Sequence, residues 1–524
     1  MELSHQEVWQ LLGLLAAVGA LLVLAPVTRI PYPIFLVLGG LAVGLVPGLP
    51  HFKLPPEVVL IAFLPPLLYL SAFFTSLRDL RANFGPISLL AIGLVAATTA
   101  GVAVIAHWAV DIDWRAAFVL GAVVSPTDPI SATSIARRLG VPRGIVTIVE
   151  GESLVNDATA LVLYRAAVVA AVSGTFSLAE TGGRLLGNAA AGIAIGLAVG
   201  YVVRQVRKRL DHSPTEITIA FLTGYLAYLP AEALGVSAVL AAVTAGIYLG
   251  WYTPELTNAD TRLQGFGFWT ILSFILNASL FTLVGLQLPD VLDGLERWST
   301  GELIAAAAAV CAAVIVIRIV WVLPFTYMKA LLGSGKANWK YGTVIAWAGM
   351  RGAVSLAAAL AIPLETDTGA PFPARELIIF LAFIVILVTL VFQGLSLPLL
   401  IRSLRIDTDP AEEREEAKAR IHAAKAALGR LEELVDEEWV REDTAERMRG
   451  TYSFRIRRFG ERLKGGDGSI ETQSQDFQRL RRELLRAEED AVVDLRRTGV
   501  ISDEVMHRVL RDIALEDVRL DAGS

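Results

Sequence analysis

Long apolar runs recur along the chain as far as Arg402, and they restrict its possible folds more than any other feature. The hydrocarbon core of a bilayer is about 30 Å thick and takes roughly 20 apolar residues per helical span. Lipid offers the backbone no hydrogen bonds, so a run of this length must satisfy its own backbone as a helix. We therefore predict an all-α, multi-pass membrane protein with about 13 transmembrane helices. The spans lie near residues 8–28, 33–50, 57–77, 86–110, 116–136, 143–173, 183–203, 215–232, 235–251, 266–289, 303–328, 341–363 and 376–401.

The charge of the chain changes after Arg405. Residues 1–405 contain 24 Lys and Arg and 23 Asp and Glu, whereas residues 406–524 contain 22 and 29. The pattern predicts a transmembrane domain over 1–405 and a soluble helical C-terminal domain over 406–524, with helices near 411–434, 473–498 and 502–521. Ser502 is expected to cap the last helix. Because this tail is net negative, we expect no nucleic acid among its partners.

Lys and Arg also indicate orientation, because cytoplasmic loops retain them. Alternate loops and ends separate into one set with sixteen of these residues and an opposite set with five, which are Lys53, Arg115, Arg184, Arg297 and Arg375. This asymmetry predicts an N-terminus outside and a cytoplasmic tail, in the plasma (inner) membrane. Residues Met1–Glu7 hold no Lys or Arg. They therefore lack the basic segment of a cleavable signal peptide, and we expect the first span to be retained.

The single cysteine, Cys311, lies inside an apolar run. This excludes a disulfide framework and a cysteine-based metal site, and we expect no cofactor. Functional candidates are instead the charges within the spans, because each costs on the order of 3 kcal/mol at the bilayer centre. They are Asp128, Glu152, Asp157, Arg318 and Arg351, with Glu150 and Arg165 nearer the span ends.

The fifth span contains Val124-Ser-Pro-Thr-Asp-Pro129, in which two prolines bracket a carboxylate. Each proline lacks an N–H and clashes with the preceding turn, so the helix is expected to be unwound here. Unwound backbone at this depth lines a cavity or is buried in protein. Free carbonyls and the Thr127 hydroxyl suit a small cation. The alternative is a proline kink in which Asp128 is paired with a neighbouring cation.

The sixth span contains Glu150-Gly-Glu-Ser-Leu-Val-Asn-Asp-Ala-Thr159. A helix places Ser153 and Asp157 one turn apart on one face, and Glu152 and Asn156 on an adjacent face. We expect Ser153 and Asp157 to point at an ion shared with Thr127 and Asp128. Glu152 is expected to be neutralised by an arginine, and a structural ion pair remains the alternative for Asp157.

The twelfth span places Arg351 between Gly349 and Gly352. Arginine stays charged in proteins, so we expect an acidic partner opposite it, either Glu152 or Asp157. Arg318, alone in the eleventh span, either pairs or extends toward the interface. If the seventh span is a linker, spans one to six and eight to thirteen form two halves, and the interrupted spans are each the fifth of their half. Inverted repeats with paired broken helices are typical of secondary transporters.

At these residues the chain resembles the monovalent cation:proton antiporter-1 family, the sodium/proton exchangers, over essentially all of 8–402. The motifs that carry the resemblance are Phe63–Tyr69, Ser125–Pro129, Gly151–Thr159, Gly349–Ser355 and Val391–Leu395. Some relatives carry an acidic residue just after the third-span motif, where this chain has Leu70-Ser71.

The resemblance implies the inverted-repeat sodium/proton antiporter fold and a homodimer in which a core moves against a dimerisation scaffold. It implies exchange of sodium or lithium for protons, with Asp157 as the ion-binding and proton-carrying carboxylate. Asp128, Thr127 and Ser153 would be the further sodium ligands, and Asn156, Glu152 and Arg351 would organise the site. The Asn-Asp pair is similar to that of the electroneutral branch.

The expected function is therefore secondary active transport for pH and sodium homeostasis, with sodium and protons as substrates, and the protein is not an enzyme. A proton and a cation compete for one buried carboxylate, which couples the two fluxes. A potassium/proton antiporter is the main alternative, because oxygen ligands alone do not select ion size. An intramembrane aspartyl protease is more remote, since its usual Gly-x-Gly-Asp context is absent.

Overall fold

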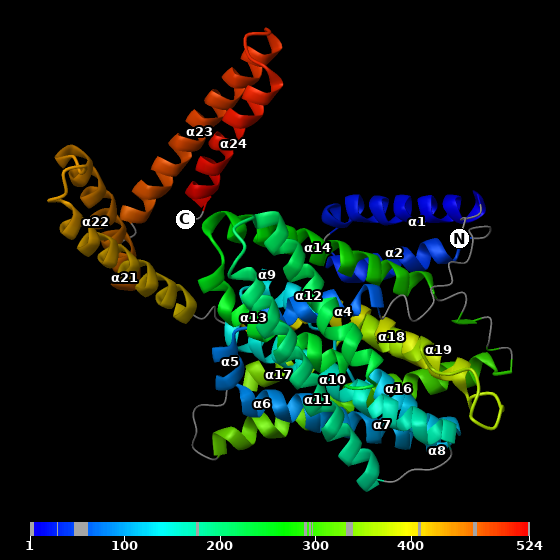
Figure 1. The fold of residues 1–524 in the computed structure, drawn as a ribbon. Coiled ribbons are helices and arrows are strands. Elements are labelled where there is room, and N and C mark those ends of the chain that lie inside the picture. Colours follow the sequence, from blue (N-terminus) through cyan, green and yellow to red (C-terminus); the bar gives the residue numbers. More distant parts are fainter. Residues whose placement is uncertain are drawn as a thin grey trace. The chain divides into compact units, whose positions relative to one another are not determined.

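The computed structural model describes residues 5–28, 30–46, 61–173, 178–287, 291–331 without 293, 294 and 296, 339–406, 410–464 and 469–521. The chain forms two compact units, Met1–Thr408 and Asp409–Ser524. Within the described ranges, the regular elements are helices throughout (Figure 1). The all-α prediction is confirmed for this part of the chain.

Seven helices of the first unit, which we call the scaffold, pack mainly against one another. Glycines allow close crossings among them, since a Cβ added at Gly40 would lie 2.3 Å from the carbonyl oxygen of Thr282. Small residues at crossings are typical of membrane helices. The scaffold consists of α1 (His5–Leu24), α2 (Tyr32–Gly44), α4 (Leu64–Phe74), α11 (Leu178–Arg207), α12 (Ser213–Ala233), α13 (Ala238–Leu256) and α14 (Ala259–Leu286).

The remaining helices of this unit form the core bundle, which surrounds a continuous apolar interior. Short π-helical segments join two pairs of its helices, Leu89–Leu94 between α6 and α7 and Thr389–Gln393 between α19 and α20. The bundle consists of α5 (Leu77–Ala82), α6 (Phe84–Ser88), α7 (Val95–Val110), α8 (Trp114–Val124), α9 (Pro129–Arg138), α10 (Arg143–Ser173), α16 (Thr300–Leu331), α17 (Trp339–Trp347), α18 (Ala353–Leu360), α19 (Arg375–Val388) and α20 (Gly394–Ser403).

Two spans of the core bundle are interrupted where the sequence predicts. The fifth is divided into α8 and α9 by the non-helical residues 125–128, and the twelfth into α17 and α18 by residues 348–352. Prolines cause the first break. Glycines permit the second, because an added Cβ would overlap the Arg318 side chain at Gly349 and the Asp128 side chain at Gly352.

Six of the described helical segments are long and apolar enough to cross a bilayer: Phe84–Val110, Arg143–Ser173, Leu186–Arg207, Ala259–Leu286, Thr300–Phe325 and Arg375–Ser403. The other predicted spans coincide with shorter, broken or less apolar helices, and the total of 13 stays a prediction. Lys53, one of the loop charges used for orientation, lies outside the described residues, as do residues 47–60 around it.

The second unit contains two helical hairpins. In the first, α21 (Pro410–Leu434) packs against α22 (Glu442–Lys464), and in the second, α23 (Ser469–Arg497) packs against α24 (Asp503–Asp521). Ser502 caps α24 as predicted, because its hydroxyl accepts a hydrogen bond from Val505 N at 3.3 Å. An ion pair of 2.6 Å between Arg481 and Glu516 links α23 to α24. The predicted helix over 473–498 begins earlier, at Ser469.

Candidate ion-binding site

The two interruptions of the core bundle cross each other. The amide of Asp128 donates a hydrogen bond of 2.7 Å to the carbonyl of Met350, which joins the two unwound segments. Gly352 lies directly against Asp128, since an added Cβ would be 2.6 Å from the Asp128 Cβ. Glycine at this position is therefore a steric requirement of the crossing.

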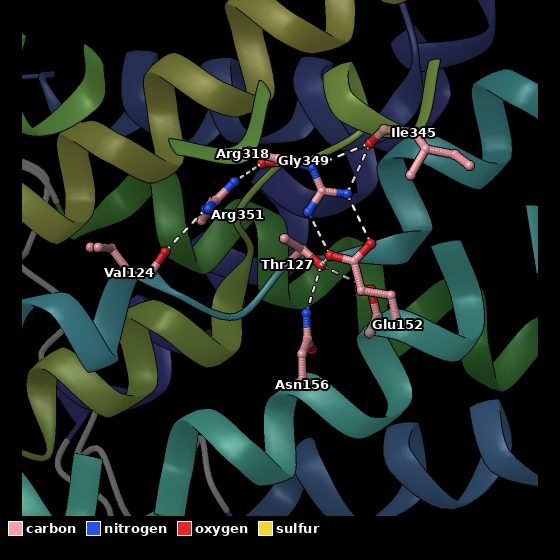
Figure 2. Close-up of polar contacts among 9 residues, drawn as sticks. Val124, Thr127, Glu152, Asn156, Arg318, Ile345, Gly349 and Arg351 are labelled. Carbon is pink, nitrogen blue, oxygen red and sulfur yellow. Dashed lines mark hydrogen bonds and ion pairs between the residues drawn. The ribbon is translucent and has the colours of Figure 1, made fainter. Parts of the chain in front are cut away.

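Thr127 lies at the centre of a polar cluster beside this crossing (Figure 2). Its hydroxyl is 3.2 Å from that of Ser153 and accepts a hydrogen bond of 2.7 Å from the Asn156 amide. It also donates to Glu152 at 3.3 Å. These four residues are at most 5% exposed. The structure thus brings together four of the six residues that the sequence predicts from the fifth and sixth spans.

Asp128 terminates the unwound segment by capping α9. Its Oδ1 accepts a hydrogen bond from the amide of Ile130 at 3.2 Å, and its Oδ2 accepts one from the hydroxyl of Ser131 at 3.0 Å. The carboxylate therefore offers its remaining lone pairs at the positive end of a half-helix, where negative charge is favourable.

Asp157 lies one turn after Ser153 on α10, on the side of the helix that faces Thr127. It is 8% exposed, and its charge interacts with that of Asp128. Among the described residues, no side chain donates a hydrogen bond to its carboxylate and no cation pairs with it. A buried, unpaired carboxylate is costly. The structural ion pair considered for Asp157 is thus absent from the described contacts.

Glu152, in contrast, is fully paired. Arg318 of α16 donates to both carboxylate oxygens, at 2.5 and 2.8 Å, and both side chains are 1% exposed. The sequence predicts that an arginine neutralises Glu152, and this is confirmed with Arg318 as that arginine. The acidic partner predicted for Arg351 is wrong, because among the described residues neither Glu152 nor Asp157 forms an ion pair with it. For Arg318 the sequence predicts only that it pairs or extends toward the interface. Its isolation in an apolar span indicates a partner but does not identify one.

Arg351 instead binds backbone carbonyls. Its guanidinium donates to Val124 O at 3.0 Å and to Gly349 O (Figure 2). Its backbone amide donates to Thr389 Oγ1 at 3.0 Å. Val124 ends α8, so the arginine satisfies carbonyls that helix termination leaves free. Arg318 does the same near the end of α17, where it donates to Ile345 O at 2.9 and 3.2 Å.

The site therefore has opposite charges at opposite helix ends. Arginines lie at the carboxyl ends of α8 and α17, and Asp128 lies at the amino end of α9. Each charge is favourable with respect to the local helix dipole. Glu150 lies apart from this arrangement, because it pairs at 2.6 Å with Arg137 in a partly exposed position.

Comparisons with known proteins agree on one family. The family model described as "Sodium/hydrogen exchanger, transmembrane" matches residues 13–403. An uncharacterized Na⁺/H⁺ exchanger of Mycobacterium tuberculosis is 36% identical over 521 residues, covering 97% of this chain and 95% of the relative. The sodium, potassium, lithium and rubidium/H⁺ antiporter of Bacillus subtilis is 32% identical over 495 residues, covering 91% and 72%.

Solved structures agree at the level of the fold. The sodium proton antiporter MjNhaP1 of Methanocaldococcus jannaschii superposes with a TM-score of 0.61 at 20% sequence identity, covering 76% of this chain and 99% of that one. The predicted antiporter fold is thereby confirmed. The matching family model, the relatives along nearly the whole chain and this fold lead to one conclusion, that the chain belongs to the sodium/hydrogen exchanger family of transporters.

Proposed function

We propose that this protein exchanges sodium or lithium ions for protons across the plasma membrane and contributes to pH and sodium homeostasis. The observation that carries the proposal is the buried carboxylate of Asp157, which has no partner among the described residues and lies beside Asp128 and a cluster of hydroxyl oxygens. Such a carboxylate binds a proton or a cation, and each excludes the other by direct competition.

The ligands for the cation come from the crossing and from α10. The Thr127 and Ser153 hydroxyls, whose oxygens are 3.2 Å apart, supply neutral oxygen ligands. The carboxylates of Asp128 and Asp157 supply negative charge. Hard oxygen ligands of this kind, completed by water, suit a small cation. Sodium is the transported substrate here, and the protein needs no resident cofactor.

Three residues hold these ligands in place. Asn156 orients the Thr127 hydroxyl through a hydrogen bond of 2.7 Å. Glu152 contacts the same hydroxyl while Arg318 neutralises its charge. Arg351 fixes the end of α8 next to the unwound segment. None of the three supplies a free charge that competes with Asp157 for the ion.

The decisive test replaces Asp157 with Asn in proteoliposomes that carry a pH gradient. We expect Asp157→Asn to abolish dissipation of the gradient on addition of sodium or lithium, because the amide cannot exchange a proton for a cation. Thermal unfolding in detergent checks that the variant folds. Near-normal exchange by a folded Asp157→Asn protein contradicts the assignment.

Potassium is a second candidate substrate, because the name of the Bacillus subtilis relative includes potassium and rubidium. The same proteoliposome assay with potassium in place of sodium distinguishes the two. We further propose a homodimer embedded in the bilayer, with the N-terminus outside, residues 406–524 forming a cytoplasmic domain, and one proton exchanged per cation. The charge of the loops supports this orientation.

A further inference from the structure

The helix that carries Asp157 contacts the scaffold along one narrow stripe. Leu154, Ala158, Leu161 and Arg165 of α10 recur at intervals of three or four residues, so they share a helix face. Leu154 and Ala158 belong to an apolar cluster with scaffold residues, and Leu161 packs against that cluster. This stripe is the part of α10 that must move if the core bundle moves against the scaffold.

The scaffold part of this apolar cluster is rich in small side chains. The buried members on α4, α12 and α13 are mostly alanines: Ala72, Ala227, Ala231, Ala238, Ala241, Ala242 and Ala245. Small residues make a smooth surface without deep interdigitation, and dispersion contacts have little directionality. Such a surface permits sliding but does not by itself specify one position of α10.

A directional contact occurs at the end of the stripe. Nη2 of Arg165 lies 2.8 and 2.7 Å from the two carboxylate oxygens of Glu232, the penultimate residue of α12. This ion pair joins the core bundle to the scaffold. Arg165 follows Asp157 by eight residues on the same helix, which corresponds to about 12 Å along its axis.

We propose that Arg165 and Glu232 form a latch at the outer end of the contact between core and scaffold. The latch holds α10 in the position seen in this structure and opens each time the ion site changes sides. The inference rests on the proposed antiport function and orientation, in which the α10 end beyond Asp157 and the end of α12 face outward. Displacement of α10 along its axis lengthens the 2.7 Å contact between Arg165 and Glu232 and weakens it. The apolar contacts with the scaffold change little over the same displacement, because they are not directional.

The strength of the pair suits this task. Its side chains are 47% and 44% exposed, and at the outer ends of the two spans, where the proposed orientation places them, water screens the attraction. Exposed ion pairs of this kind shift an equilibrium by at most about fivefold. A buried pair such as Arg318–Glu152 would hold the carrier too tightly to be broken in every cycle.

A reversible cross-link tests whether the latch must open. Full-length protein with Arg165→Cys and Glu232→Cys, in a Cys311→Ala background, is treated in proteoliposomes with a short, reducible bis-methanethiosulfonate. We expect at least about tenfold loss of exchange on cross-linking, full recovery after reduction, and no loss in either single-cysteine variant treated in the same way. Unchanged exchange by protein whose cross-link is verified by intact mass overturns the proposal, and so does failure of the two cysteines to cross-link.

Charge variants test whether the pair sets the position of α10. A Leu161→Cys reporter on the stripe is labelled from the outer side with a membrane-impermeant thiol reagent. We expect Glu232→Gln or Arg165→Gln to raise the labelling rate about two- to fivefold, and the exchanged pair Arg165→Glu with Glu232→Arg to restore the original rate. Equal labelling in all variants overturns the proposal.

The labelling assay needs no transport activity. If the wild-type protein fails to exchange cations for protons, the proposed function is wrong, and the labelling rates still decide whether the pair restrains α10.

Discussion

At the scale of single residues, the site separates charges that are available to an ion from charges that are not. Glu152 and Asp157 both lie on α10, but Glu152 is held by Arg318 whereas no described cation pairs with Asp157. The two carboxylates therefore differ because Arg318 of α16 lies next to one of them and not because of their residue types. In the proposed function Glu152 organises the site and Asp157 binds the ion.

This difference predicts the stability of two variants on the same helix. Glu152→Gln leaves the buried guanidinium of Arg318 without its counter-ion and should lower the free energy of unfolding by about 3–5 kcal/mol. Glu150→Gln, the matched control, breaks a partly exposed pair with Arg137 and should cost less than about 1 kcal/mol. Thermal unfolding in detergent compares them, and equal melting temperatures contradict the structural role of Glu152.

The residues of the cluster could be predicted because polar groups in apolar spans are rare and their helical spacing groups them. Thr127, Ser153 and Asn156 were identified in this way, and the structure brings them together. The partners of the arginines could not be predicted. Arg351 binds backbone carbonyl oxygens that lack a helical partner only because the fifth and twelfth spans are interrupted. Every residue carries such an oxygen, so no side-chain pattern in the sequence identifies the ones that are bound.

At the scale of elements, the two broken helices are the feature that sequence predicts best, because proline and glycine act locally. Their crossing is a tertiary property, and it depends on how closely the unwound segments approach. The hydrogen bond from Asp128 N to Met350 O and the contact of Gly352 with Asp128 define this approach.

The crossing predicts a strong effect of one added methyl group. Gly352→Ala places a Cβ 2.6 Å from the Asp128 Cβ, so the two segments must separate. We expect at least about tenfold loss of sodium-dependent proton flux, because displacement of a positioned group by about 1 Å has effects of this size. The control is Gly301→Ala, whose Cβ meets nothing within 4 Å. Comparable flux in the two variants contradicts the role of the crossing.

At the scale of the whole molecule, the apolar runs and the change of charge near Arg405 predict a membrane unit followed by a charged helical unit. The structure has compact units Met1–Thr408 and Asp409–Ser524. The family resemblance implies a division of the membrane unit into core and scaffold, but the sequence does not show which helices belong to each. Long apolar helices occur in both groups, and the grouping depends on long-range packing, such as that of α2 against α14 and of α4 against α13.

Orientation in the membrane can be tested on the whole molecule. Single cysteines replace Gln475 of α23 and Arg115 of α8, both exposed, in the Cys311→Ala background. In everted vesicles we expect an impermeant thiol reagent to label Gln475→Cys, and in right-side-out cells we expect it to label Arg115→Cys. The reverse pattern contradicts the proposed cytoplasmic tail.

The pairing of Glu152 with Arg318 has a consequence for voltage. The charges of Glu152 and Arg318 cancel each other. The described charges that remain near the site are those of Arg351, Asp128 and Asp157, which sum to one negative charge. Either a proton or a sodium ion neutralises that charge, so the two loaded forms are electrically equivalent. A membrane potential acts on a moving charge with about 2.3 kcal/mol per 100 mV. Under the proposed exchange of one proton per cation no net charge moves, so we expect the exchange to follow the ion gradients and not the resting potential.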